Sequence, residues 1–211
     1  MNTQRKDRIV FKAVNTFISS LWIFFKVDEE QMHEGINDNQ LKRREILAKL
    51  RRTSGKPLSY VLSTVPIIAK YMAEKSYSKP TYEEQAIVTA LQIYAWHQQG
   101  KSTSVNTEEN KNIGHSLSIL RTETHTSSMD KRFTRFIMED DFNSMVIQLR
   151  QMIRLLKSKS EERVNYSVLA KDLYWFLSGS KENVRLMWAR AYYSIKRKEG
   201  ENTNENKSAG E

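Results

Sequence analysis

Glycine and proline are scarce in this chain, which has only 7 Gly and 3 Pro among its 211 residues. Sheet proteins need frequent tight turns, and these two residues make most of them, whereas helices can be joined by short polar loops. The remaining composition is that of an ordinary globular protein, with 39% hydrophobic and 28% charged residues. The sequence therefore predicts an all-α fold.

Apolar residues recur at three- and four-residue spacing along most of the chain, which is the period of a helix with one buried face. The widest stripe lies in residues 8–26, where it is aromatic and predicts a helix at the centre of an N-terminal bundle. Thr81 and Glu84 have the spacing of a capping box. The other helices are predicted over residues 39–52, 60–74, 82–97, 128–140, 142–158, 167–177 and 181–198, and residues 117–121 begin the second half.

Residues 99–112 are polar and offer almost nothing to a core, which predicts a loop or an interdomain linker. We therefore expect two small helical bundles, residues 1–98 and 113–198, joined by this polar linker. The last residues, 199–211, are rich in Glu, Asn, Lys and Gly and are predicted to form a disordered tail.

The sequence lacks the residue patterns of catalysis. It has no cysteine, which excludes disulfides, a thiolate metal site and a catalytic thiol, and fits a reducing cytoplasm. His33, His97, His115 and His125 lack metal-site spacing, and no phosphate-binding loop or nucleophile elbow is present. The acidic run 139–141 would need a second carboxylate cluster to hold Mg²⁺ for a nuclease. We expect no enzymatic activity, metal or cofactor.

No stretch of the sequence is long and apolar enough to cross a bilayer. The N-terminus resembles a signal peptide briefly, but polar residues interrupt its apolar stretch and acidic residues follow where small ones belong. The helix predicted there has a polar face of Asn, Thr and Ser, unlike the Lys/Arg-rich face of a membrane-surface helix. A core helix in a cytoplasmic protein, with no membrane partner, is the better interpretation.

Positive charge is spread over both predicted bundles. The net charge is +9, and by our count it divides into +5 for residues 1–111, +7 for residues 112–198 and −3 for the tail. A basic surface suits a polyanionic partner, because phosphate neutralisation releases counterions. A charge that serves only solubility is the alternative.

Basic residues repeat at helical spacing on two consecutive predicted helices. Lys131, Arg132 and Arg135 form one ridge, and Arg150, Arg154 and Lys157 form the other. Two such ridges could line a groove that follows a phosphate backbone, with Arg forks meeting phosphate oxygens. An ordinary solvated face is the alternative. The nearby aromatic residues, mostly expected in the core with a minority free to stack on bases, are Tyr174, Trp175, Phe176, Trp188, Tyr192 and Tyr193.

The order of motifs in the second half resembles the CasB family, the small subunit of the type I-E CRISPR surveillance complex called Cascade. GHSLSILR at residues 114–121 precedes SSMDKRFTRFIMEDD, then MVIQLRQMIRLL at residues 145–156 and VNYSVLAKDLYWF at residues 164–176. The Leu50, Arg51 and Arg52 step extends the resemblance more loosely into the first half, so that it spans roughly residues 10–195.

This resemblance implies a non-catalytic protein of two helical bundles that joins other Cascade subunits, usually as two copies, with CRISPR RNA and target DNA as partners. It implies that the chain holds the RNA–DNA heteroduplex and the displaced strand by their backbones in the cytoplasm of a prokaryote. A helical scaffold that binds acidic proteins without nucleic acid is the alternative. The candidate backbone-binding residues are Arg51, Arg52, Arg121, Lys131, Arg132, Arg135, Arg150, Arg154 and Lys181.

Overall fold

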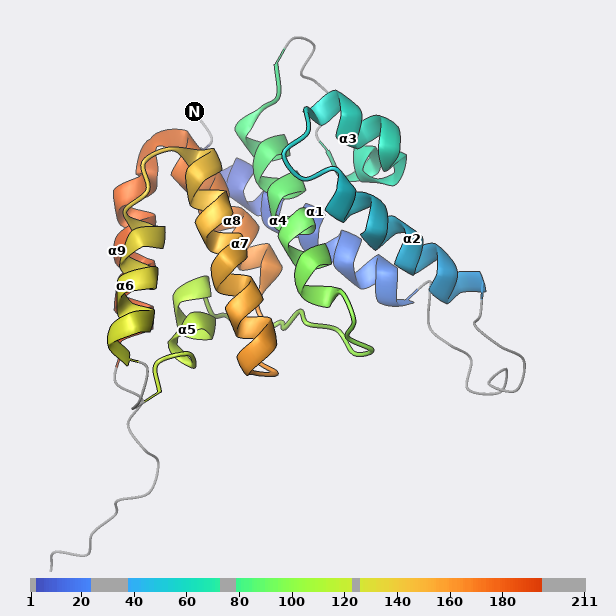
Figure 1. The fold of residues 1–211 in the computed structure, drawn as a ribbon. Coiled ribbons are helices and arrows are strands. Elements are labelled where there is room, and N and C mark those ends of the chain that lie inside the picture. The colour runs from blue at the N-terminus through green and yellow to red at the C-terminus, as the bar shows by residue number, and fades with distance from the viewer. Residues whose placement is uncertain (1–2, 24–37, 73–78, 123–125, 195–211) are drawn as a thin grey trace, which may run out of the picture.

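The computed structural model describes residues 3–23, 38–72, 79–122 and 126–194, and no strand occurs within these ranges (Figure 1). The all-α fold is confirmed. None of the described helices has the length and apolarity needed to cross a membrane. In chain order the elements are α1 (Thr3–Ile23), α2 (Asp38–Arg52), α3 (Leu58–Thr64), η2 (Pro66–Tyr71), α4 (Tyr82–Gln98), α5 (Ile113–Ser118), α6 (Thr126–Ile137), α7 (Phe142–Lys159), α8 (Tyr166–Trp175), η3 (Phe176–Ser180) and α9 (Lys181–Tyr193).

Helix α4 is the centre of the fold. Its capping box is confirmed, because Thr81 Oγ1 accepts from the Glu84 N–H at 3.2 Å and the Glu84 carboxylate accepts from the Thr81 N–H at 2.8 Å. Of its 17 residues, 14 are buried, and α1, α2, α7 and α8 pack around it (Figure 1). Because most of this helix is buried, its neighbours hold its ends in fixed positions, and its C-terminal end carries the candidate site.

The helix predicted over residues 60–74 is wrong in part. Pro66 has no N–H to donate, so α3 ends at Thr64 and the chain continues as the 3₁₀ helix η2, which begins at Pro66. The predicted residues 73–74 lie outside the described ranges. Near the other end of the chain, α8 passes into the π-helical turn η3, where Gly179 takes a φ of 99° and lets α9 start in a new direction.

The described residues of the two predicted bundles share one buried core. Helix α8 packs on α1 and α4, and a single hydrophobic cluster runs from Val10 of α1 to Tyr192 of α9. The described parts of the two halves therefore pack against each other, and the division into bundles at residues 99–112 stays a prediction. The predicted tail, residues 199–211, lies outside the described residues.

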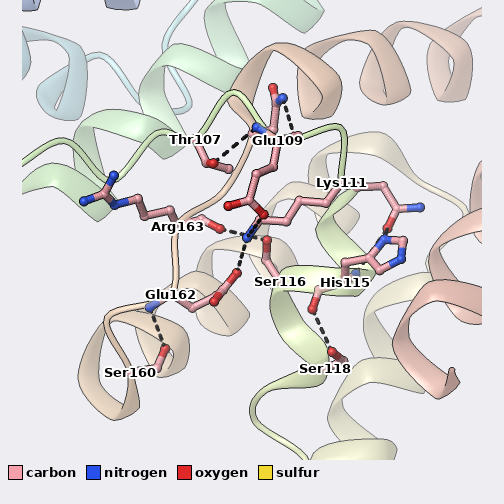
Figure 2. A network of polar contacts seen from close by, with 11 residues as sticks. Thr107, Glu109, Lys111, His115, Ser116, Ser118, Ser160, Glu162 and Arg163 are labelled. Carbon is pink, nitrogen blue, oxygen red and sulfur yellow. Dashed lines mark hydrogen bonds and ion pairs between the residues drawn. The ribbon is translucent and has the colours of Figure 1, made fainter. Parts of the chain in front are cut away.

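The polar segment 99–112 forms no helix, as expected of a loop, yet it lies against the strand-like stretch before α8. Val105 is buried, and Val164 donates its N–H to the Val105 carbonyl at 3.0 Å. Figure 2 shows the Lys111 side chain extending from this segment, and its Nζ contacts the carboxylates of Glu162 at 2.6 Å and Glu109 at 3.2 Å. These contacts fix the chain that leaves the C-terminal end of α4.

Candidate nucleic-acid interface

Two hollows meet at the C-terminal end of α4, and together we call them the basic groove. The first has a volume of about 840 Å³ and lies between Trp96 and the α7 residues Ile147, Arg150, Arg154 and Lys157. The second, of about 770 Å³, is lined by Arg43, Arg44 and Arg51 of α2, with Trp22 and Lys101. Gln99 lines both hollows, so the basic groove runs from α7 across the end of α4 to α2.

The end of α4 positions two of these cations. Arg51 Nη1 donates to the Ala95 carbonyl at 3.2 Å, and Lys157 Nζ donates to the Trp96 carbonyl at 3.1 Å. Carbonyls in the last turn of a helix lack intrahelical partners and carry partial negative charge, so cations are stable there. The helix thereby holds one cation from α2 and one from α7 on either side of its end.

Two arginines of the basic groove lie over tryptophan rings. Arg150 Cζ is 4.6 Å from the Trp96 ring centroid, and its Nη1 donates to Ser54 Oγ at 3.1 Å. Arg43 Cζ is 4.1 Å from the Trp22 centroid. Cation–π contacts of this kind hold a guanidinium in place without neutralising its charge.

The basic groove carries positive charge that its own residues do not neutralise. Burial, and then the charges of Arg51 and Lys101, lower the pKa of Lys157. Burial lowers the pKa of Arg51, and Arg52 lowers it further. Within the described ranges no carboxylate pairs with Arg51, Arg150, Arg154 or Lys157, whereas Lys101 is paired with Glu161. An anion bound here would relieve the mutual repulsion of these cations.

Several of the remaining candidate residues already have partners. Arg121 forms a two-point contact with Asp130, 2.9 Å from Nε, and lies over the rings of Tyr192 and Tyr193. Lys181 pairs with Asp140 at 2.6 Å. A phosphate at either position would have to compete with a carboxylate that is already in place.

The four other candidates, Arg52, Lys131, Arg132 and Arg135, are exposed but do not line the basic groove. The last three belong to α6, which packs on α7 and α9, while α4 packs on α7 (Figure 1). Of the sequence-predicted set, the structure therefore brings together Arg51, Arg150 and Arg154. It does not bring the α6 ridge into the same groove.

The family to which the chain belongs follows from a sequence comparison. A family model described as CRISPR-associated protein Cse2 matches residues 46–193, well over half of the chain. The chain belongs to the Cse2 family. This is the CasB family of the type I-E Cascade complex, as the order of motifs predicts, and membership makes the other Cascade subunits its partners. A search of curated proteins gives no significant match.

Solved structures show the same fold at low sequence identity. CasB from Thermobifida fusca is 21% identical with a TM-score of 0.65, and the likeness covers 90% of this chain and 98% of that one. CasB from M. ruber is 20% identical with a TM-score of 0.61, over 86% and 92% of the two chains. CasB from Thermus thermophilus is 19% identical with a TM-score of 0.54, over 85% and 97%. The likeness in fold thus covers nearly the full length of each of these three chains.

Sequence reasoning missed part of the basic groove in this Cse2 chain. Trp96, Arg43, Arg44 and Lys101 line it but were not candidates, and Lys157 was recognised only as part of the α7 ridge. The dense basic run in α2 was a signal for Arg43 and Arg44. Trp96 had a weaker signal, because its indole ends an apolar helix at the point where the sequence turns polar.

The aromatic residues of α8 and α9 are mostly core, as predicted. Tyr174, Phe176, Trp188 and Tyr192 are buried, whereas Tyr193 is exposed. Trp188 stacks on Phe136 with centroids 5.2 Å apart, which ties α9 to α6. These rings have protein partners on their faces and do not line the basic groove.

The acidic run has structural contacts. Asp140 pairs with Lys181 and with Arg185, and Asp141 accepts from the Ser144 N–H at 2.8 Å as the N-cap of α7. Among the described residues, no group of three or more His, Cys, Asp or Glu side chains is arranged to hold a metal ion.

Proposed function

We propose that this Cse2 chain is a non-catalytic Cascade subunit that holds nucleic-acid backbone in its basic groove. In the assembly it stabilises the duplex of CRISPR RNA with target DNA and the displaced DNA strand, beside a second copy of itself. The complex acts in the cytoplasm of a prokaryote in antiviral defence. Because base pairing with the guide reads the sequence, a subunit that contacts only backbone charge is sufficient.

The observation that carries the proposal is a set of four cations with no carboxylate partner among the described residues, three of which are held in place by protein contacts. Arg51 and Lys157 are held by the α4 carbonyls, Arg150 is held by Ser54 and Trp96, and Arg154 lies on the same wall. Cations held in place by protein contacts lose little side-chain freedom when a phosphate arrives. The remaining candidates are weaker candidates for phosphate contacts. They are Arg121 and Lys181, which are paired with carboxylates, and the α6 ridge.

The test is binding of a fluorescently labelled single strand across a salt series, measured by anisotropy. Arg154→Gln removes one cation of the groove, and Arg190→Gln, an exposed α9 residue outside it, is the control with the same charge change. The slope of log K against log salt is negative. We expect it to be shallower by about 0.7 in Arg154→Gln, the value for one single-strand phosphate contact. Arg190→Gln should leave the slope unchanged.

Three outcomes would contradict the proposal in different ways. Equal slopes for the two variants would remove the groove from the interface. If the salt slope becomes shallower in Lys131→Gln/Arg135→Gln but not in Arg154→Gln, the interface lies on the α6 ridge. Absence of binding to any strand at low salt, with salt-insensitive binding to an acidic protein, would favour the scaffold that binds no nucleic acid.

A further inference from the structure

Two large apolar side chains are exposed inside the basic groove. Trp96, in the last turn of α4, keeps 37% of its surface exposed, and Ile147 of α7 keeps 53%. Exposed apolar groups gathered in a hollow indicate a binding surface, because a ligand that covers them removes apolar area from water. Phosphate contacts alone give no reason for an indole and an isoleucine in this place.

The groove fixes the Trp96 ring beside cations. The Arg150 guanidinium lies over one face of the ring and is anchored by Ser54, and Lys157 donates to the Trp96 backbone carbonyl. Arg154 lies on the same wall without a carboxylate partner in the described ranges. The ring stays 37% exposed, and Arg154 and Lys157 line the same hollow. An exposed indole beside cations matches one nucleotide, whose base would stack on the ring face opposite Arg150 and which has a phosphate on either side.

We propose that Trp96 stacks on an unpaired base of a nucleic-acid strand whose flanking phosphates contact Arg154 and Lys157. This inference rests on the proposed function and makes its ligand specific: the strand in this groove is single-stranded. In a duplex both faces of each base are covered by neighbouring bases, so only an unpaired base offers its face to an indole. Stacking tolerates every base, which agrees with a subunit that reads no sequence.

Two alternatives to a stacked base predict different binding behaviour. If Trp96 serves only to support Arg150, the base of the ligand has no effect on affinity. An acidic protein segment would supply negative charge but no aromatic face. The property that separates a stacked base from both is dependence on the base itself at constant phosphate number.

The experiment compares two labelled strands of about twelve nucleotides, a normal single strand and an abasic chain with the same phosphates. The full-length protein is titrated with each at one low salt concentration. We expect wild type to bind the normal strand about 5- to 150-fold more tightly than the abasic chain, the range for one stacked base. Trp96→Leu, which keeps an apolar side chain without a π face, should bind the two strands equally.

Two controls separate stacking from damage to the fold. Tyr82→Leu removes an aromatic side chain that is 50% exposed at the opposite end of α4, and it should keep the wild-type preference. Trp96→Phe keeps a smaller ring and should keep part of the preference. Melting temperatures near that of wild type show that each variant is folded.

Each result bears on one proposal. Equal affinity of wild type for the two strands overturns stacking and leaves backbone binding intact. A preference that survives in Trp96→Leu also overturns it, because the base then contacts another residue. If the protein binds neither strand, the proposed function is wrong, and this inference is wrong with it.

Discussion

Asp172 carries a carboxyl group in the core, where the Trp188 indole donates to it at 2.8 Å. Burial raises its pKa from 3.8 to about 6, although the indole contact lowers it. A raised pKa means that the folded state binds the proton more tightly. The contribution of this bound proton to the unfolding free energy is fully present below pH 3.8 and is lost as the pH rises through about 6.

Asp172→Asn should therefore gain stability relative to wild type as the pH rises from 4 to 7, by roughly 2 kcal/mol. Asparagine keeps an oxygen for the indole and has no charge to bury. Urea denaturation at several pH values measures the difference in unfolding free energy. A difference that does not change with pH would show that this carboxyl group ionises in the folded protein as easily as in water.

His97 reports on the positive charge of the basic groove. Burial first, and then the charges of Lys157 and Lys101, lower its pKa to about 4. The folded pKa of His97 lies below the unfolded value of 6.5, so this residue lowers the unfolding free energy as the pH falls from 6.5 to about 4. The pH dependence is opposite to that of Asp172, which lowers the unfolding free energy as the pH rises. Lys157→Gln should raise the pKa of His97 in an NMR titration. Lys131→Gln, on α6, is the control and should not shift it.

At this scale the sequence predicts burial better than it predicts partners. The aromatic residues of α8 and α9 were expected mostly in the core from their helical spacing, because spacing decides which face of a helix is covered. The pairing of Arg121 with Asp130 was not predicted, since it depends on where the tertiary fold places α6 relative to Arg121 and not on a repeat. Trp96 was missed because a tryptophan at the end of an apolar helix is usually core.

At the scale of elements, α5 and α9 approach each other closely at Gly114. A Cβ atom on this residue would lie 2.1 Å from the Trp188 carbonyl oxygen, so the helices would have to move apart. Gly114→Ala should destabilise the protein by about 1–3 kcal/mol, as overpacking does, despite the better helix propensity of alanine. Thermal or urea unfolding measures this. His115→Ala, at the exposed neighbour, should change stability by less than about 0.5 kcal/mol.

The helices themselves were largely predictable. The N-cap and capping box of α4 were predicted from Thr81 and Glu84, because these side chains hydrogen-bond to backbone groups only three residues away. The end of α3 was missed although Pro66 is visible in the sequence, since the apolar spacing continues through it. The π-helical turn of η3 was also missed, because its form depends on how α8 and α9 pack as well as on Gly179.

At the scale of the whole molecule, the shared core predicts cooperative unfolding. If α8 covers α1 and α4, neither half can lose its structure without exposing the other. We expect one calorimetric transition for the full chain, with equal calorimetric and van't Hoff enthalpies. A fragment of residues 1–98 should lack a cooperative transition. Two separate transitions, or a fragment that melts cooperatively, would instead establish residues 1–98 and 113–198 as independent bundles.

The composition and the helical periods were sufficient for the fold class, and the motif order was sufficient for the family. The way in which the halves pack was not predictable, because the face of α8 that meets α1 is apolar in any arrangement. The basic groove was predicted on its α7 side and at Arg51. Its remaining residues come from α2, α4 and the segment after α4, which only the tertiary structure brings to one place.

The packing of α1 on α8 also has a consequence for synthesis of the protein. The first helix leaves the ribosome with Val10, Val14 and Phe17 on a face whose main partner spans residues 166–175. At translation rates of about 5–20 residues per second, that partner follows on the order of ten seconds later. During this interval α4 and η2 can already pack on α1, but the part of its face that α8 covers stays exposed to water, so a chaperone can bind it until α8 emerges.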